Sequence, residues 1–407
     1  MKKILFVSYG GGHVNLLFPV YRQLFNCYDC DFLALTTAGS VLKASGFSHL
    51  GFKDLLEPGD DKAMAYGKAL VGEASDGGAV PYDESVAYMG LSFWDLVERH
   101  GEAEAHQMYQ QGGGRQVFYP ITPLRRFLEK TMPDLVVATN SPRAERAAID
   151  AATELGIPSV CVVDLFAFQV VKWIGQPGFA TRVCVLSDFV RQMMTDAGRT
   201  EDEIIVTGNP AFDNIAAIRD SDAGQVYRDD KGWGDAEKVV LWASNVEPKL
   251  HPFSDKEGNP DLPREVETYL LQLAQQHLNV RVVFRPHPND PYQPDDLPER
   301  VEMSSSADNL DALLSAVDCV VVLSSTVGFQ AALMGKPLVN IKLSIFSRDA
   351  PYDAMGLSLG VEDLTQLNET IMTAVKEGQK ATGLPETGTA TKRVVKVIEN
   401  ILELYTQ

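Results

Sequence analysis

Short apolar segments recur along this chain, and most of them are followed by a turn and then by an amphipathic helical segment. The first unit consists of residues 3–8, a Gly-Gly-Gly-His turn at residues 10–13, and a segment with Leu17, Val20 and Leu24 on one helical face. The order strand, glycine turn, helix is typical of a parallel sheet covered by helices. This alternation predicts an α/β fold, and it limits the possible folds more than any other feature of the sequence.

The apolar segments form two groups, separated by a less regular stretch that contains Gly175, Pro177 and Gly178. Because 407 residues exceed what one hydrophobic core usually supports, we expect two domains. We place them at residues 1–175 and 176–407, each a Rossmann-like, doubly wound parallel sheet, with the final helix packing in the second domain. The expected strands are residues 3–8, 31–36, 134–139, 158–164, 182–186, 204–207, 239–243, 280–284, 319–323 and 337–341.

A long segment between the second and third strands does not follow the alternation. Residues 52–120 are polar and contain scattered aromatic side chains, and they are too many for a plain loop in a compact domain. We expect a helical insert there, lying over the ligand cleft. In doubly wound sheets ligands bind at the carboxyl ends of the strands, and we expect the two crevices to face each other.

Charge and hydropathy narrow the possible functions. The formal net charge is −19 at pH 7, which argues against binding to nucleic acid or to an anionic membrane surface, because both need clustered Lys and Arg. No run approaches the ~20 apolar residues of a membrane-spanning helix. The N-terminus enters a strand at once, so we expect a cytoplasmic protein without a signal peptide and without stable membrane insertion.

The five cysteines form no recognisable metal or disulfide pattern. Cys161, Cys184 and Cys319 lie within apolar strand segments, where free thiols are usual in a reducing compartment. Cys27 and Cys30 have CxxC spacing, but no second Cys or His pair completes a zinc site. We therefore expect neither a metal ion nor a cofactor.

The end of one strand in the second half is a candidate phosphate site. Residues 285–288 read Arg-Pro-His-Pro, so that Arg285 and His287 point to the same face of the strand at its carboxyl end. Both side chains can donate hydrogen bonds to a phosphate. The alternative is a strand-end histidine bonded to neighbouring backbone, with the prolines merely ending the strand.

A second candidate lies about forty residues later in the sequence. The apolar residues 319–323 run into Ser324, Ser325 and Thr326, and then into a helical segment that contains Gly328 and Gln330. A helix N-terminus preceded by hydroxyl groups is a favourable anion site. Ser325 and Thr326 alone would also serve as plain helix caps. Together with residues 285–288, this turn could surround one phosphate group.

The turn after the first strand suggests a general base. His13 follows Gly11 and Gly12 at the end of that strand, where a neutral imidazole can accept a proton near pH 7. The alternative is a histidine bonded to backbone beside a glycine turn. Asp164 ends another first-domain strand and is a candidate base or an orienting partner for His13, whereas Asp76, in an Asp-Gly pair within the insert, is a weaker candidate.

Three segments resemble the second domain of glycosyltransferases with the GT-B fold, in which two Rossmann-like domains face each other. They are residues 207–210 (Thr-Gly-Asn-Pro), 285–288 and 324–337. The His-Pro and Ser-Ser pairs resemble those of bacterial sialyltransferases, capsule Kdo transferases and glycerophosphotransferases of the CDP-glycerol type. The resemblance implies donor binding by Asn209, and contacts to the donor phosphate from His287 and the Ser324-Ser325 pair.

Two features refine this resemblance. The same segments are also similar to the hydrolysing UDP-N-acetylglucosamine 2-epimerases, which are isomerases on the same fold. Residues 10–19, however, resemble the Gly-His-Val-Asn-Pro-Leu-Leu loop of nucleotide-sugar glycosyltransferases, in which the histidine is the base that activates the acceptor. The epimerases open with a Gly-Thr-Arg-Pro-Glu type of loop, which is missing here. Gln330 stands where many relatives carry a glutamate that binds the donor ribose.

The sequence thus predicts a metal-independent GT-B glycosyltransferase. It would move a sugar from a nucleotide-linked donor, bound by residues 180–385, to a hydroxyl of a glycan or glycoconjugate acceptor bound by the first domain. A leaving group with one phosphate fits the short 324–328 turn, so we expect a CMP-linked acidic sugar such as a nonulosonate or Kdo, with Arg285 facing its carboxylate. The alternatives are a nucleotide-sugar 2-epimerase, a UDP-sugar transferase and an inactive sugar-binding protein.

Overall fold

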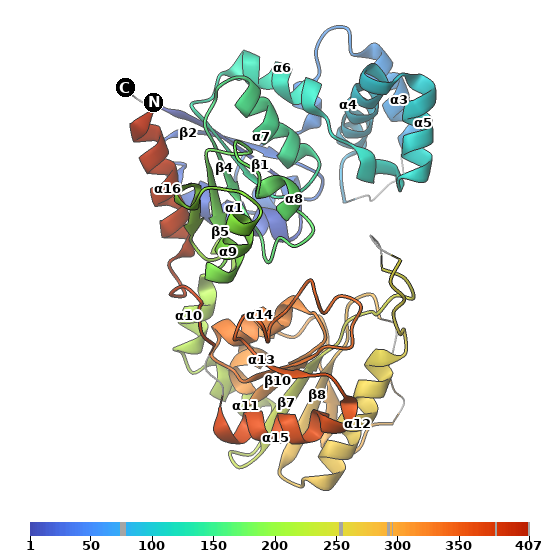
Figure 1. Ribbon diagram of the computed structural model, residues 1–407, viewed down its shortest axis with the longest axis vertical. Helices are drawn as coiled ribbons and strands as arrows, with labels where there is room; N and C mark the ends of the chain where they lie inside the picture. The colour runs from blue at the N-terminus through green and yellow to red at the C-terminus, as the bar shows by residue number, and fades with distance from the viewer. Residues whose placement is uncertain (74–78, 252–254, 291–293, 295, 379–380, 406–407) are drawn as a thin grey trace. The chain divides into compact units, whose positions relative to one another are not determined.

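The structure is a computed structural model, and it describes residues 1–73, 79–251, 255–290, 294, 296–378 and 381–405 (Figure 1). The chain forms two compact units. The first comprises Met1–Ala211 together with Thr389–Gln407, and the second comprises Phe212–Gly388. Asp76, named above as a candidate base, lies outside the described residues.

A six-stranded parallel sheet forms the centre of the first unit, with the strand order β2-β1-β3-β4-β5-β6. Its strands are β1 (Lys3–Ser8), β2 (Asp29–Ala34), β3 (Leu135–Thr139), β4 (Ser159–Val162), β5 (Arg182–Val185) and β6 (Ile204–Val206). From β1 the chain adds β2 on one side and then β3 on the other. The order therefore reverses between β1 and β3, and a ligand crevice is expected at the carboxyl ends of these two strands.

The helices of the first unit connect these strands. They are α1 (Gly12–Leu24), α2 (Ala38–Ala44), η1 (Phe52–Leu55), α3 (Asp61–Val71), α4 (Tyr82–His100), α5 (Glu102–Gln111), η2 (Gly114–Val117), α6 (Ile121–Thr131), α7 (Ala144–Glu154), α8 (Val171–Ile174), α9 (Asp188–Asp196), η3 (Glu201–Glu203) and α16 (Ala390–Leu404), with η4 (Pro210–Phe212) at the boundary. Residues 52–120 thus contain α3, α4 and α5, which lie together beyond α6 in Figure 1.

The last helix belongs to the first unit, contrary to our expectation that it would pack in the second domain. Val394, Ile398 and Ile401 form one apolar face of α16, and these side chains are buried in the same core as Phe6 and Leu17. The spacing of these apolar residues predicts a buried face, but it does not show against which domain that face packs. The structure shows that α16 covers α1.

The boundary between the units also lies later than expected, at Ala211 and Phe212 instead of residues 175 and 176. The irregular stretch near residue 175 is held in the first unit by the fully buried guanidinium of Arg199. This group donates hydrogen bonds to the carbonyl oxygens of Ile174 and Gln176, both at 3.1 Å, and to that of Ala180. The stretch is therefore a loop fixed by hydrogen bonds within the first unit, and the sheet of this unit continues through β5 and β6.

The second unit contains another six-stranded parallel sheet, with the order β12-β11-β10-β7-β8-β9. Its strands are β7 (Lys238–Ala243), β8 (Val280–Arg285), β9 (Val301–Met303), β10 (Cys319–Val322), β11 (Leu338–Ile341) and β12 (Leu359–Val361). Its helices are α10 (Asn214–Arg219), α11 (Ala223–Lys231), α12 (Leu262–Gln276), α13 (Leu310–Ala316), α14 (Thr326–Leu333), η5 (Leu364–Gln366) and α15 (Leu367–Glu377). The expectation of two doubly wound parallel sheets is confirmed.

Two glycines allow α3 and α4 to approach each other closely. A Cβ atom on Gly67 would lie 2.1 Å from the carbonyl oxygen of Val86, and one on Gly90 would lie 2.2 Å from that of Ala63. Since both obstacles are backbone atoms, a side chain at either position would force the helices apart. This contact helps to place α4, which carries residues of the pocket described below.

Gly67→Ala is therefore expected to destabilise the protein. In an open helix the same change would stabilise by about 1 kcal/mol through helix propensity. Here the overlap with Val86 should outweigh that gain and lower the free energy of unfolding by about 1–3 kcal/mol. Urea unfolding measures the change, with the exposed Ala65→Ser on the same helix as a control that should stay within about 0.5 kcal/mol. A stabilised Gly67→Ala variant would contradict the close approach.

Candidate functional site

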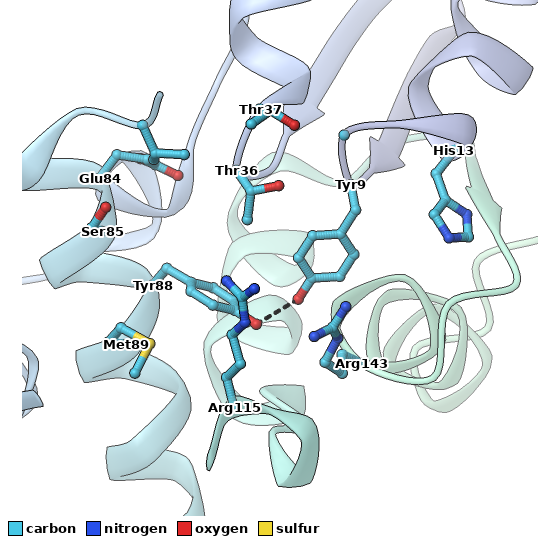
Figure 2. Close-up of a pocket in the computed structure, with 12 residues that line it drawn as sticks. Tyr9, His13, Thr36, Thr37, Glu84, Ser85, Tyr88, Met89, Arg115 and Arg143 are labelled. Carbon is cyan, nitrogen blue, oxygen red and sulfur yellow. Dashed lines mark hydrogen bonds between the residues drawn. The ribbon is translucent and has the colours of Figure 1, made fainter. Parts of the chain in front are cut away.

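A cavity of about 420 Å³ opens in the first unit beside the carboxyl ends of its strands. Figure 2 shows the side chains that line it. The lining residues are Tyr9, Gly10, His13, Thr36, Thr37, Val80, Glu84, Ser85, Tyr88, Met89, Arg115 and Arg143. They come from the turns after β1, β2 and β3, from the start of α1, from α4 and the residues just before it, and from η2, so the sheet and the helical insert both contribute to this pocket.

The turns after β1 and β2 are tightly fitted to one another. A Cβ atom on Gly10 would lie 1.8 Å from the hydroxyl oxygen of Thr37, so only glycine fits there. Gly11 has a φ of 66°, in the left-handed region that favours glycine. Thr36 has a φ of 53°, which is uncommon for a β-branched residue. Strained backbone of this kind is often found at functional sites.

His13 is the second residue of α1, and its imidazole is positioned by the neighbouring strand β3. The Nδ1 atom of His13 lies 2.8 Å from the hydroxyl oxygen of Thr139, the last residue of β3. That hydroxyl in turn donates to the Oε1 atom of Glu145, at 3.3 Å. The same carboxylate oxygen accepts a hydrogen bond of 2.7 Å from the backbone N–H of Tyr9.

This chain of contacts selects one tautomer of the histidine. A hydroxyl group has a single proton, so when Thr139 donates it to Glu145, its oxygen accepts from Nδ1–H of His13. The neutral ring then carries its lone pair on Nε2. A histidine in this state can accept a proton at Nε2, and the imidazolium that forms is stabilised through Thr139 by the carboxylate.

Glu145 is completely buried in the first turn of α7. Burial raises the pKa of its carboxyl group, because the charged form loses its hydration. Positive charge on His13 and the backbone N–H of Tyr9 act in the opposite direction and favour the carboxylate. Burial and these contacts therefore act on the pKa of Glu145 in opposite directions, and burial has the larger effect.

Two tyrosines and two arginines form the opposite part of the lining. The hydroxyl groups of Tyr9 and Tyr88 are hydrogen-bonded to each other at 2.8 Å, as the dashed line in Figure 2 shows. The guanidinium carbon of Arg143 lies 4.6 Å from the centre of the Tyr9 ring. Burial raises the pKa of both phenols, that of Tyr9 well above its usual value, so both remain protonated at neutral pH.

Asp164 and Asn209 take part in a different set of contacts in the first unit. Asp164 accepts a hydrogen bond of 2.9 Å from the side-chain amide of Asn140, and its backbone carbonyl accepts one of 2.6 Å from Asn209. Among the described residues, the lining of the cavity does not include Asp164. The partner that orients His13 is thus Thr139, where the sequence suggested Asp164. Asn209, expected in the second domain, belongs to the first unit.

In the second unit, the structure places His287 after the carboxyl end of β8, half-buried. Its Nδ1 atom accepts a hydrogen bond of 3.1 Å from the backbone N–H of Asn289, so the neutral ring carries its proton on Nε2 as a donor. Arg285 donates to the hydroxyl of Ser304 and to the carbonyl of Ser305, both at 2.8 Å. Arg285 therefore fastens the segment after β9, which differs from the expected contact with a donor carboxylate.

The Ser-Ser-Thr turn connects β10 to α14. Ser325 is the N-cap of this helix, and its hydroxyl accepts a weak bond of 3.4 Å from the N–H of Val327. Its carbonyl accepts a bond of 2.6 Å from the hydroxyl of Tyr352. Ser324 and Gln330 are half-buried, Thr326 is exposed, and Gly328 is buried with Val322 and Tyr352 close to it. Ser325 thus serves as a helix cap, and the turn is fixed by Tyr352.

The two candidate phosphate segments are not on adjacent strands, because β7 lies between β8 and β10. Both follow carboxyl ends and so lie at the same edge of the sheet. The segment after β7, with Ser244 and Asn245, lies between them, and the Oδ1 atom of Asn245 is buried without a hydrogen-bond partner within the described ranges. No sequence pattern described above marks these two residues.

Six side chains of the first-unit site were not predicted from the sequence. The signal for two of them was present, since a polar Thr-Asn-Ser run begins at the end of a buried strand and a glutamate lies in the first turn of the next helix. The other four could not be recognised, because only the fold brings the insert and the turns together. The missed residues are Tyr9, Tyr88, Arg115, Thr139, Arg143 and Glu145.

Metal sites and membrane-spanning helices are both absent from the part of the chain that the structure describes. No cluster of three or more His, Cys, Asp or Glu side chains there could hold a metal ion. No helix among the same residues is long and apolar enough to cross a bilayer.

The two sheets, each six-stranded, parallel and flanked by helices, give this chain the two-domain α/β architecture of the GT-B-like fold. Comparison with solved structures shows this directly. UDP-GlcNAc 2-epimerase from Neisseria meningitidis, bound to UDP-GlcNAc, has a TM-score of 0.61 at 14% identity, with 98% of this chain and 100% of that chain covered. No protein-family model and no curated protein sequence matches the chain.

Two further structures have the same fold. UDP-GlcNAc 2-epimerase from Methanocaldococcus jannaschii, in complex with UDP-GlcNAc and UDP, has a TM-score of 0.59 at 11% identity, covering 98% of this chain and 99% of that chain. A structure described as the glycotransferase of kitacinnamycin has a TM-score of 0.56 at 14% identity, with 98% and 99% covered. At such low identity the likeness establishes the fold, and the fold carries both isomerases and transferases.

The raised pKa of Glu145 predicts how a Glu145→Gln substitution changes stability with pH. In the folded protein the carboxyl group ionises less readily than in the unfolded chain. The free energy of unfolding therefore decreases as pH rises from the ordinary pKa of 4.5 toward the raised value. Glutamine keeps an oxygen for the N–H of Tyr9 and has no charge. The free energy of unfolding of Glu145→Gln should therefore increase relative to that of the wild type as pH rises.

Urea unfolding across the range from about pH 4.5 to pH 8 measures this difference. Glu154→Gln, an exposed change on the same helix, should follow the wild-type curve throughout. If Glu145→Gln instead loses stability relative to the wild type as pH rises, the carboxylate is stabilised, not destabilised, by its surroundings.

Proposed function

We propose that this protein is a nucleotide-sugar enzyme that transfers a sugar to a hydroxyl group, with His13 as the general base. The first unit would bind the acceptor in the cavity beside His13, and the second unit would bind the nucleotide through the carboxyl edge of its sheet. The observation that carries this proposal is the contact between Nδ1 of His13 and Thr139, backed by Glu145, on the lining of that cavity.

The proposed reaction needs one proton to be moved. The acceptor hydroxyl donates a hydrogen bond to Nε2 of His13, and its proton passes to that atom as the oxygen attacks the anomeric carbon. The bond from that carbon to the donor phosphate breaks, and its electron pair leaves with the nucleotide. His287 can donate from Nε2–H to the departing phosphate, and the N-terminus of α14 adds its positive dipole end.

The nucleotide we propose is uridine diphosphate. Two of the structures named above contain UDP-GlcNAc or UDP by their descriptions, and none of the three is described with a cytidine nucleotide. The expectation of a CMP-linked donor rested on the short turn after β10 and on Arg285. Nη1 of Arg285 binds Ser304 and Ser305, so only the remaining N–H groups of this side chain could bind a donor carboxylate.

A second candidate function is the 2-epimerisation of a UDP-linked sugar. The fold likeness to two UDP-GlcNAc 2-epimerases favours it. Epimerisation needs a proton to be removed from carbon 2 and returned to the opposite face, without any acceptor. In heavy water an epimerase would introduce deuterium at carbon 2 of the sugar, whereas a transferase would release UDP only when an acceptor is present. Mass spectrometry of the two reactions separates the candidates.

If His13 is the base, His13→Ala should lower kcat by about 10²-fold or more while the affinity for UDP changes little. The exposed His100→Ala in α4 is the matched control and should keep full activity. Thr139→Val keeps the shape of the side chain and removes its hydroxyl, so it should lower kcat less than His13→Ala and shift the pH profile. Full turnover by His13→Ala would assign the base to another residue.

The choice of nucleotide can be tested separately by calorimetric titration with UDP, CDP and CMP. We expect UDP to bind at least ten times more tightly than CMP, a difference of about 1.4 kcal/mol. His287→Ala should lower the affinity for UDP more than the affinity for uridine, because the proposed partner of His287 is a phosphate group. Tighter binding of CMP than of UDP would restore the cytidine donor.

A further inference from the structure

The cavity in the first unit has an excess of positive charge. Two guanidinium groups line it, those of Arg115 and Arg143, against the single carboxylate of Glu84. Both oxygens of that carboxylate are already engaged, since Glu84 accepts from the backbone N–H groups of Phe52 at 2.7 Å and of Lys53 at 3.2 Å. The carboxylate therefore holds η1 in place, and it can offset at most one of the two guanidinium charges.

Neither arginine forms an ion pair with an acidic side chain within the described ranges. Arg143 lies against the ring of Tyr9, and its Nε atom is buried without a hydrogen-bond partner among the same residues. A guanidinium that rests on an aromatic face keeps its N–H donors at its edge, where they can bind a planar or tetrahedral oxyanion. The net charge of the chain is −19, so an anion can bind only where positive charge is concentrated locally. Two arginines without acidic partners provide such a concentration in this pocket.

The two tyrosines add a further donor at the same place. Their hydroxyl groups carry two protons, and the bond of 2.8 Å between them uses one. The other proton remains for a ligand. Both guanidinium groups lie close enough to Tyr88 to act on it electrostatically, and Figure 2 shows both side chains reaching toward the pair of hydroxyls. Donors from α4, η2 and the turn after β3 thus converge.

We propose that the acceptor carries an acidic group, a carboxylate or a phosphate, which Arg115 and Arg143 bind together with the Tyr9–Tyr88 pair. This inference rests on the proposed role of the cavity as the acceptor site. A volume of about 420 Å³ accommodates a single acidic sugar unit. The acidic group is then held on the side of the two tyrosines, and a hydroxyl of the same sugar can be presented to His13.

Binding of simple sugars to the full-length protein tests the proposal without any turnover. The probes are methyl β-glucuronide, glucose 6-phosphate and the neutral methyl β-glucoside, titrated by NMR in the presence of UDP. We expect at least one acidic probe to bind ten or more times tighter than the neutral one. The tighter of the two acidic probes identifies the group as a carboxylate or a phosphate.

The variants Arg115→Gln and Arg143→Gln, and the two combined, should remove this preference while the thermal midpoint and the affinity for the neutral sugar stay unchanged. Arg22→Gln, which removes an exposed arginine on α1, is the matched control and should keep it. Equal binding of acidic and neutral sugars by the wild type, no binding of any probe, or a preference that survives in the double variant would overturn the proposal.

Two further results separate this inference from its rivals. If the double variant binds UDP at least ten times more weakly, the arginines serve the phosphates of the donor and the proposal is wrong. If His13→Ala keeps both full activity and the preference for an acidic sugar, the assignment of the base fails while the acidic site stands.

Discussion

The candidate site depends on the reversal of strand order between β1 and β3. Because the chain leaves β1 toward one side of the sheet and β3 toward the other, a crevice is expected between the carboxyl ends of these two strands. His13 follows one of these strands and Thr139 ends the other, and the parallel pairing of Val7 with Ala138 brings the two ends together. A shift of register between β1 and β3 would separate the imidazole from the hydroxyl.

Glu145 connects this site to the stability of the fold. Its buried carboxylate holds the backbone N–H of Tyr9 and the hydroxyl of Thr139, and it therefore joins the turn after β1, the end of β3 and the start of α7. Burying such a group is unfavourable unless it is hydrogen-bonded. Here the carboxylate is hydrogen-bonded, and the role we propose for it is to orient His13 through Thr139.

Much of the fold could be predicted from the sequence, because apolar strands alternate with amphipathic helices at clear spacing. The edge strands β9 and β12 were missed, because they read Val-Glu-Met and Leu-Gly-Val and contain no continuous apolar run. The equally short edge strand β6 reads Ile-Ile-Val and was recognised. His13 stood out because it follows a glycine turn. Arg115 and Arg143 did not, because their common environment depends on how the insert packs, and for the same reason α16 was assigned to the wrong domain.

The return of α16 to the first unit makes the second unit an insertion within the first. During synthesis, Val14, Leu17 and Tyr21 of α1 emerge before the second unit, whereas Val394 and Ile398, which share their core, emerge after it. Contacts between such distant segments form slowly, because a long loop must close first. An apolar surface of the nascent first unit therefore stays exposed to solvent until the second unit and α16 have been synthesised. During this period the chain is most prone to aggregation.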